Sequence, residues 1–141
     1  MTDVSVTGSC LCGSVKYTVT GKAKHFYHCH CQRCRKATGT GHASNLLITP
    51  GTSIKWSQGE ESLSRYKVPE AERFYNCFCQ NCGSPMPRVV PELNAVIIPA
   101  GSLDIEAPIS PQAHIFWDSR AQWSCQDDLP VFSEQALPQK N

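Results

Sequence analysis

The chain has 141 residues and a formal net charge of +1, which fits one domain around a single core and excludes the strongly basic surface of a nucleic-acid-binding protein. It contains no run approaching the roughly 20 apolar residues that span a bilayer, and its first residues have neither the basic nor the apolar region of a secretory signal. We therefore expect a cytoplasmic protein that binds neither nucleic acid nor a membrane.

Short segments of alternating polar and apolar side chains predict strands. The first covers 15–20, and Gly21 with the lysines after it is expected to end it. A cysteine-rich loop follows over 28–34, and 35–38 is expected to form one helical turn. Further expected strands are 46–48, 52–56, 63–67, 73–78 and 95–98. Because the chain has ten prolines, nine glycines and no long apolar stripe of helical period, we expect a mainly β domain.

The nine cysteines are the most unusual feature of the composition. Disulfides are uncommon in a reducing compartment, where clustered cysteines more often bind metal or react. Nine is also an odd number, which fits poorly with a fully paired disulfide framework. The count and the spacings together therefore favour metal binding over disulfides.

Two pairs of closely spaced cysteines share one design: Cys10 with Cys12, and Cys79 with Cys82. Each pair is followed by a glycine, which permits a tight turn whose backbone amides point at thiolate sulfurs. Together the pairs, called the tetrad below, supply a complete tetrahedral set for zinc, with Zn–S distances of roughly 2.3 Å. A site closed by four thiolates leaves no position for substrate, so we expect a structural zinc that stabilises the fold. The alternative is that these are free cysteines of the core.

A second cluster, called the triad below, has the spacing C-x-C-x-x-C and consists of Cys29, Cys31 and Cys34. Three protein ligands with an open fourth position are typical of a reactive zinc. Basic neighbours would favour thiolates there by lowering the pKa of the thiols; they are Arg33, Arg35 and Lys36. An exogenous thiol or a carbonyl oxygen could occupy the open position.

Two other interpretations of the triad stay open. A fourth ligand from His28, His30 or Cys77 would make this second site structural as well. Alternatively, the three thiols are free of metal and redox-active. Cys77 is otherwise expected to be a buried spectator thiol and Cys125 to be incidental. His42 and His114 are expected to be structural, although His42 follows the cysteine loop closely enough to line its pocket.

The order of these motifs resembles the glutathione-dependent formaldehyde-activating enzyme family, whose relatives include centromere protein V. The resemblance runs from Gly8 to Phe132. Its first residues are Gly8-Ser9-Cys10-Leu11-Cys12-Gly13, Val15-Lys16-Tyr17, His28-Cys29-His30-Cys31, Cys34-Arg35-Lys36 and Thr38-Gly39. The later ones are Phe78-Cys79-Gln80-Asn81-Cys82-Gly83-Ser84, Gly101-Ser102-Leu103-Asp104, His114-Ile115-Phe116, Ser119-Arg120-Ala121-Gln122-Trp123 and Asp127-Asp128-Leu129-Pro130-Val131-Phe132.

The resemblance implies a β-tent fold, made mainly of antiparallel sheets around a structural zinc, in a single domain over 1–141 with its core at about 8–132. It implies that the structural zinc is held by Cys10, Cys12, Cys79 and Cys82, and a catalytic zinc by Cys29, Cys31 and Cys34. The family joins glutathione to formaldehyde, giving S-hydroxymethylglutathione. The implied partners are therefore a small-molecule thiol and an aldehyde.

The expected function is that of a zinc-dependent carbon–sulfur lyase acting on a thiol and a small aldehyde, or on their adduct. Zinc at the triad would bind the thiolate or polarise the carbonyl. His30 is the nearest candidate for a catalytic general acid and base, and a histidine inside the loop would equally serve to orient it by hydrogen bonds. The rival classes are a non-catalytic zinc-stabilised binding module and a thiol redox or metal sensor. The sequence leaves a homo-oligomer open.

Overall fold

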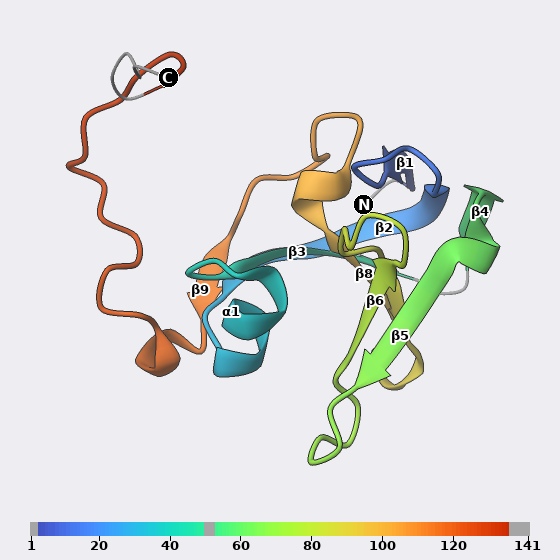
Figure 1. Ribbon diagram of the computed structural model, residues 1–141, viewed down its shortest axis with the longest axis horizontal. Helices are drawn as coiled ribbons and strands as arrows, with labels where there is room; N and C mark the ends of the chain where they lie inside the picture. Colours follow the sequence, from blue (N-terminus) through green and yellow to red (C-terminus); the bar gives the residue numbers. More distant parts are fainter. Residues whose placement is uncertain (1–2, 50–52, 136–141) are drawn as a thin grey trace.

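The computed structural model describes residues 3–49 and 53–135, and within these ranges the chain is mainly β (Figure 1). The described part contains nine strands, one α-helix, α1 (Gln32–Thr38), and four short 3-10 turns. The predicted mainly β fold, with antiparallel curled sheets and little helix, is thereby confirmed, and it agrees with a β-tent. Over the same residues, no helix is both long enough and apolar enough to span a membrane.

The larger sheet is built around β2 (Lys16–Cys29), the longest strand. The order along the sheet is β1, β2, β3, β8 and β7, and β4 and β9 also pair with β2. Their bounds are Val4–Ser9 for β1, Ala43–Thr49 for β3, Ile54–Gln58 for β4, Arg88–Val90 for β7, Ala95–Pro99 for β8 and Ala113–Ile115 for β9. The pairs are antiparallel except β2 with β9, which is parallel and sets His28 opposite His114. β2 is therefore the strand that brings distant segments together.

A second sheet consists of the hairpin formed by β5 (Leu63–Lys67) and β6 (Tyr75–Cys79), which stands beside the larger sheet (Figure 1). Leu63 pairs with Cys79 at one end of the hairpin, and Lys67 pairs with Tyr75 at the other. The Lys67 ammonium closes the loop by donating a hydrogen bond to the carbonyl of Ala71. The end of β6 carries the second cysteine turn, so the position of the hairpin determines where that turn lies.

The expectation that Gly21 ends the first predicted strand is wrong, because β2 continues to Cys29. A Cβ atom at position 21 would lie 2.5 Å from the carbonyl oxygen of Thr49 in β3. Glycine is therefore needed where the two backbones approach closely, and here it marks a contact within the sheet instead of a strand end.

A bulge in β2 changes which of its side chains face the core. The register with β3 shifts between Ala23 and His25. Before the shift the buried side chains are at odd positions, among them Tyr17 and Val19, and after it Phe26 is buried. Because side chains alternate along a strand, the bulge reverses the face that each later residue of β2 occupies.

The hydrophobic core draws on both sheets. Its fully buried members include Val6, Val19, Leu46, Ile48, Val96 and Ile98 from the larger sheet, with Cys77 and Cys79 from β6. Each such aliphatic side chain contributes roughly 1.5–3 kcal/mol by leaving water. Tyr17 is also buried, and its hydroxyl pairs with Ser102 at 2.6 Å, which satisfies its polar end.

Several predicted elements have the expected place. The predicted strand 63–67 coincides with β5, and 95–98 lies within β8. The predicted strand 52–56 corresponds to β4, although residue 52 lies outside the described residues. The helical turn predicted over 35–38 is the second half of α1, which already begins at Gln32. β1, β7 and β9 were not predicted.

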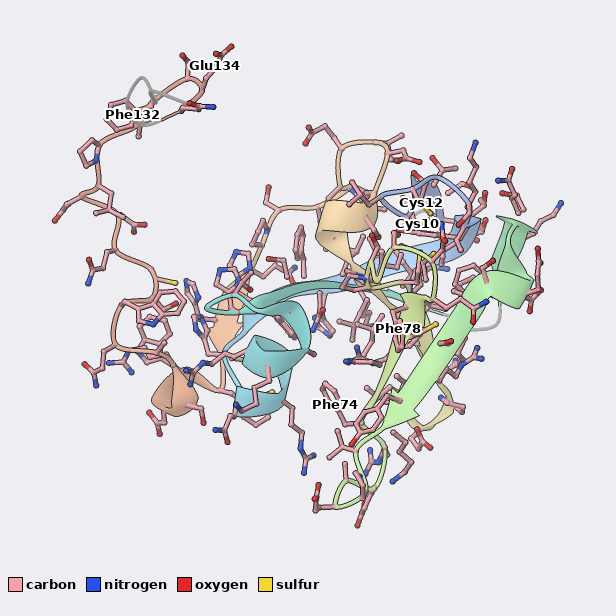
Figure 2. The ribbon with its side chains drawn as sticks, viewed as in Figure 1. Cys10, Cys12, Phe74, Phe78, Phe132 and Glu134 are labelled. Atoms are coloured by element: carbon pink, nitrogen blue, oxygen red, sulfur yellow. The ribbon has the colours of Figure 1, made fainter. Side chains whose placement is uncertain are left out.

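The C-terminal segment follows a short 3-10 turn at Trp117–Ser119 and then runs away from the sheets (Figure 1). Phe132 and Glu134 lie near its far end (Figure 2). The first part of this segment still contacts the body of the fold, since Ala121 is buried and Trp123 to Asp127 lie beside His28 and His42.

Candidate metal centres

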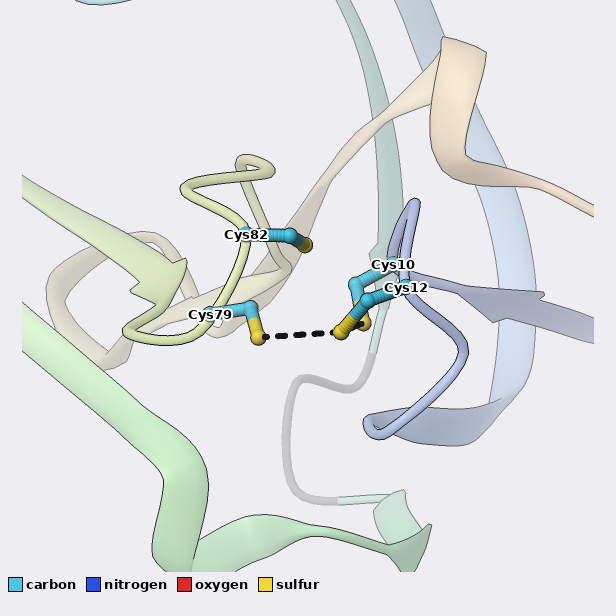
Figure 3. Close-up of side chains that lie close together, drawn as sticks. All are labelled: Cys10, Cys12, Cys79 and Cys82. Atoms are coloured by element: carbon cyan, nitrogen blue, oxygen red, sulfur yellow. Dashed lines mark hydrogen bonds between the residues drawn. The ribbon is translucent and has the colours of Figure 1, made fainter.

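The tetrad lies where two tight turns face each other. Cys10 and Cys12 occupy the turn between β1 and β2, and Cys79 and Cys82 occupy the turn that follows β6 (Figure 3). The amide of the glycine after each pair donates to the carbonyl of the first cysteine, at 3.0 Å in the first turn and 2.7 Å in the second. Both glycines adopt a left-handed backbone conformation, with φ of 79° and 78°. The glycines expected from the sequence are thus required by these turns.

The four sulfur atoms of the tetrad fit a tetrahedral zinc site. All four lie within 4.8 Å of one another, with the Sγ atoms of Cys10 and Cys12 3.6 Å apart and those of Cys12 and Cys79 4.0 Å apart (Figure 3). Zn–S bonds of about 2.3 Å in a tetrahedron place the sulfurs about 3.8 Å apart. The two separations given lie on either side of this value, so the arrangement of the four sulfurs is compatible with a zinc ion.

Neighbouring hydroxyl and amide groups favour thiolates in the tetrad. A hydrogen bond from the Ser14 hydroxyl, with a smaller contribution from Asn81, lowers the pKa of Cys12 to about 7. A hydrogen bond with the Ser84 hydroxyl is the main reason why the pKa of Cys82 is lowered to about 5. Because metals bind the thiolate, both shifts prepare the tetrad for a cation.

The triad is assembled at the junction of β2 and α1. Cys29 is the last residue of β2, Cys31 is the N-cap of α1 and Cys34 lies in its first turn. The sulfur of Cys31 accepts a hydrogen bond from the backbone amide of Cys34 at 3.3 Å, so a thiol takes the capping role that Ser or Asp usually has. The helix is short because Gly39 ends it in a left-handed conformation, with φ of 71°. The three sulfurs lie within 4.8 Å of one another.

A pocket of about 580 Å³ adjoins the triad on one face of the larger sheet. Side chains from five strands and α1 line it, including Tyr27, Leu47, Ile97, Ile115 and Arg33, together with the three cysteines. Phe74, from the loop of the β5–β6 hairpin (labelled in Figure 2), and Arg88, from β7, also line it, and the Arg88 guanidinium lies over the Phe74 ring at 5.1 Å from its centroid. The walls are thus largely apolar, and the two arginines supply positive charge.

The triad thiols differ strongly from one another in acidity. A hydrogen bond from Cys34 is the main reason why the pKa of Cys29 is lowered to about 6, and Arg88 adds a smaller electrostatic effect. The pKa of Cys34 is raised, first because of its hydrogen bond to Cys29 and second because of burial. Of the basic neighbours in the sequence, Arg35 donates instead to the carbonyl of Ser119 at 3.0 Å. Arg88, which is remote in sequence, is the cation that acts on Cys29.

Four of the five histidines lie on the opposite side of the β2 backbone from the triad. His30 is fully buried, and its Nε2 lies 2.9 Å from Nδ1 of His114. His28 and His42 pack against each other with ring centroids 4.2 Å apart, and both contact this pair. Burial and the neighbouring imidazoles lower the pKa values of His28, His30 and His42, which favours the neutral form of these rings. His30 and His42 are not among the residues that line the triad pocket.

Three residues at these sites were not predicted from the sequence to take part in them: Phe74, Arg88 and Cys125. Phe74 and Arg88 reach the triad through the hairpin and through β7, and their sequence context gives no local signal of this. Cys125 lies near His114, with its sulfur 4.0 Å from Nδ1, although it was expected to be incidental. Cys77 is buried in the core and is not one of the tetrad or triad ligands.

Comparison with known proteins gives a family and similar solved structures. The family model described as glutathione-dependent formaldehyde-activating enzyme matches residues 5–119, a span that contains the tetrad and the triad. The crystal structure of a Rhodobacter sphaeroides protein from a structural genomics programme matches with a TM-score of 0.56 and 18% identity, covering 77% of this chain and 98% of that chain. At this identity the likeness shows the fold alone. No curated protein matches the chain.

Proposed function

Since the chain belongs to the glutathione-dependent formaldehyde-activating enzyme family, we propose that it is a zinc-dependent carbon–sulfur lyase acting on a thiol and an aldehyde, or on their adduct. The observation that carries this proposal is the triad beside a pocket of about 580 Å³. A pocket next to three cysteine sulfurs has room for a substrate at the position that a fourth ligand would otherwise take.

The two cysteine clusters are proposed to have different roles. The tetrad supplies four thiolates, which complete the coordination of zinc and leave no vacant position, so it is structural. The triad supplies three, so it is catalytic. Zinc at the triad would supply Lewis acidity at one open position. Cytoplasmic location and a single domain over 1–141 are part of the same proposal.

The side chains around the pocket are proposed to bind and orient the thiol. Arg33 and Arg88 provide two cations that can receive the carboxylates of a glutathione-like thiol by charge-assisted hydrogen bonds. Leu47 and Ile97 add apolar surface to the same lining, where Ile97 pairs with Arg88 across β8 and β7, and they are proposed to exclude water. In the forward direction a carbon–sulfur bond forms between the thiol and the carbonyl carbon, and the thiol proton ends on the former carbonyl oxygen.

A proton carrier is needed between sulfur and oxygen. Tyr27 lines the pocket on the same face of β2 as Cys29, and its hydroxyl lies 2.9 Å from Nδ1 of His25. We assign the proton transfer to this hydroxyl. The complete burial of His30 on the other side of the backbone supports the second role expected for that residue, which is to orient the cysteine loop.

The proposal is tested by the rate at which glutathione and formaldehyde exchange with S-hydroxymethylglutathione, measured by exchange NMR. The protein loaded with zinc should accelerate the exchange, and Cys31→Ser should remove the acceleration. Cys77→Ser is the matched control, because Cys77 lies in the core and outside the triad. Tyr27→Phe should reduce the acceleration about 100-fold, the lower end of the range for general acid–base catalysis.

Exchange no faster with the zinc-loaded protein than without it contradicts the activity. If zinc at the triad is then retained against a competing thiol, the binding module becomes the better description. A triad disulfide that forms under mild peroxide with release of zinc would favour the sensor instead.

A further inference from the structure

We propose that His30, His114 and Cys125 form a third metal site, which takes a divalent transition metal ion such as zinc. The site is separate from the tetrad and the triad, and it does not rest on the proposed lyase activity. Cys125 follows the last residue of the family match, which ends at 119, so this ligand set is not contained in the matched region.

The separations of the three donor atoms suit a small cation. All three lie within 4.8 Å of one another, with 2.9 Å between Nε2 of His30 and Nδ1 of His114, and 4.0 Å between that Nδ1 and Sγ of Cys125. Tetrahedral zinc with bonds of about 2.0–2.1 Å to nitrogen and 2.3 Å to sulfur needs about 3.3 Å between the nitrogens and about 3.6 Å between nitrogen and sulfur. Each observed value differs from this by less than half an ångström.

The donor types point to the same class of ion. Two imidazoles and one thiolate form a borderline-to-soft set, which favours zinc and its neighbours over calcium or magnesium. In the hydrogen bond between His30 and His114 one ring must donate, whereas a metal would accept a lone pair from each. His30 is fully buried, and a metal bound at its Nε2 would leave Nδ1 as the protonated nitrogen of the ring.

The cluster also has access to solvent. A cavity of about 390 Å³ is lined by His28, His42, His114, Trp123, Cys125 and Asp127. His28 of β2 lines it, whereas Tyr27 and Cys29 on either side of His28 line the triad pocket, so the two pockets lie on opposite faces of β2. An ion can therefore enter from this side, and a water molecule can complete its coordination.

The backbone around Cys125 holds its sulfur toward the histidines. Cys125 has φ of 59°, a left-handed conformation that is unfavourable for a residue other than glycine. The preceding residue is fixed by the hydrogen bond from the Ser124 amide to the Ala121 carbonyl, at 3.0 Å. A Cβ atom on Gly41 would lie 2.7 Å from Oγ of Ser124, so the segment packs tightly beside the histidines. The energy of a metal–sulfur bond would offset this conformation.

The test counts metal ions in the full-length protein. The chain with Cys31→Ser, in which the triad is disabled, is equilibrated with micromolar free zinc, and bound zinc is measured by inductively coupled plasma mass spectrometry. Adding Cys125→Ser or His114→Ala should lower the content by about one ion per chain. His25→Ala is the matched control, because His25 is the chain's one histidine outside the cluster of four imidazoles, and it should leave the content unchanged.

Cobalt provides the second measurement. In the Cys31→Ser chain, Co²⁺ should give a sulfur-to-metal charge-transfer band. The intensity of this band should fall by the contribution of one thiolate when Cys125 is replaced. Cys125 is exposed, so Cys125→Ser is expected to fold, and circular dichroism checks this. Equal zinc content and equal cobalt spectra with and without Cys125→Ser would overturn the proposal. Loss of metal in the His25→Ala control as well would also overturn it, because the binding would then be non-specific.

Discussion

The sulfur atoms of the tetrad differ in exposure, although they serve one site. Cys12 lies at the surface, whereas Cys79 has no exposed surface and belongs to the core. Cys79 therefore packs in the core and also supplies a sulfur to the tetrad, so a substitution there would change stability and metal binding together. Cys12 offers the cleaner change, because little besides the sulfur's contacts with Ser14, Asn81 and the other cysteines depends on it.

We predict that Cys12→Ser loses zinc to a chelator that the unchanged protein resists, because three thiolates hold zinc less firmly than four. Zinc released to a colorimetric indicator during dialysis provides the measurement. Cys77→Ser serves as the control: it should keep its zinc, while burial of a hydroxyl in place of a thiol lowers the free energy of unfolding by about 1–3 kcal/mol. Equal zinc retention in Cys12→Ser and the unchanged chain would argue against the tetrad.

Among the elements, β9 shows how a strand of three residues can position a site. It pairs in parallel with the end of β2, which sets Ile115 opposite Cys29, and the amide of His30 donates to the carbonyl of Ile115 at 2.9 Å. The Ile115 side chain packs against the cluster of Cys29, Cys34 and Ala43. One residue of β9 thus supports the triad and its neighbour His114 faces the other side of the sheet.

We predict that Ile115→Ala lowers the free energy of unfolding by about 2 kcal/mol, the lower end of the range for such a truncation because the side chain is only partly buried. Zinc affinity at the triad should fall as well, since Cys29 loses its packing partner. Urea denaturation and competitive zinc titration measure the two effects. Ile105→Ala is the control at an exposed isoleucine and should change the stability by less than about 0.5 kcal/mol. If both variants were equally stable, β9 would have no such supporting role.

Local motifs could be predicted from the sequence, whereas contacts between distant segments could not. The tetrad and triad could be grouped from sequence because each cluster consists of short local motifs whose spacing is itself the signal. The strand β5 could be predicted because its alternation is local. β9 could not, because three residues carry no period and are held by pairing with a strand some 85 residues earlier, as His28 opposite His114 shows. Arg88 and Cys125 were missed for the same reason: tertiary contacts bring them to the clusters.

For the molecule as a whole, the tetrad joins the two sheets. One of its turns connects β1 to β2 in the larger sheet, and the other ends the β5–β6 hairpin. A metal held between them constrains segments separated by 67 residues between Cys12 and Cys79. Since such an ion binds the folded chain and not the unfolded one, its binding energy adds to folding stability.

We predict that the melting temperature depends on free zinc. At a concentration about 1,000 times its dissociation constant, zinc should stabilise the chain by ~4 kcal/mol. Thermal unfolding followed by circular dichroism, with buffered zinc against a strong chelator, measures this. Cys12→Ser should show a much smaller dependence. A melting temperature that is the same in zinc and chelator would mean that the two sheets are held together by the hydrophobic core alone.

The bulge in β2 has a consequence for how this protein can change over evolution. Between the bulge and α1 the chain alternates thiols with imidazoles, one set toward the triad pocket and the other toward His114. A point substitution in 28–31 alters one donor at one cluster. Gain or loss of a single residue at the bulge would instead exchange the two sets, so that nitrogen donors entered the pocket and sulfur donors left it. A substitution therefore changes the triad or the histidine cluster separately, whereas an insertion or deletion changes both at once. The length of this segment is thus constrained as well as its composition.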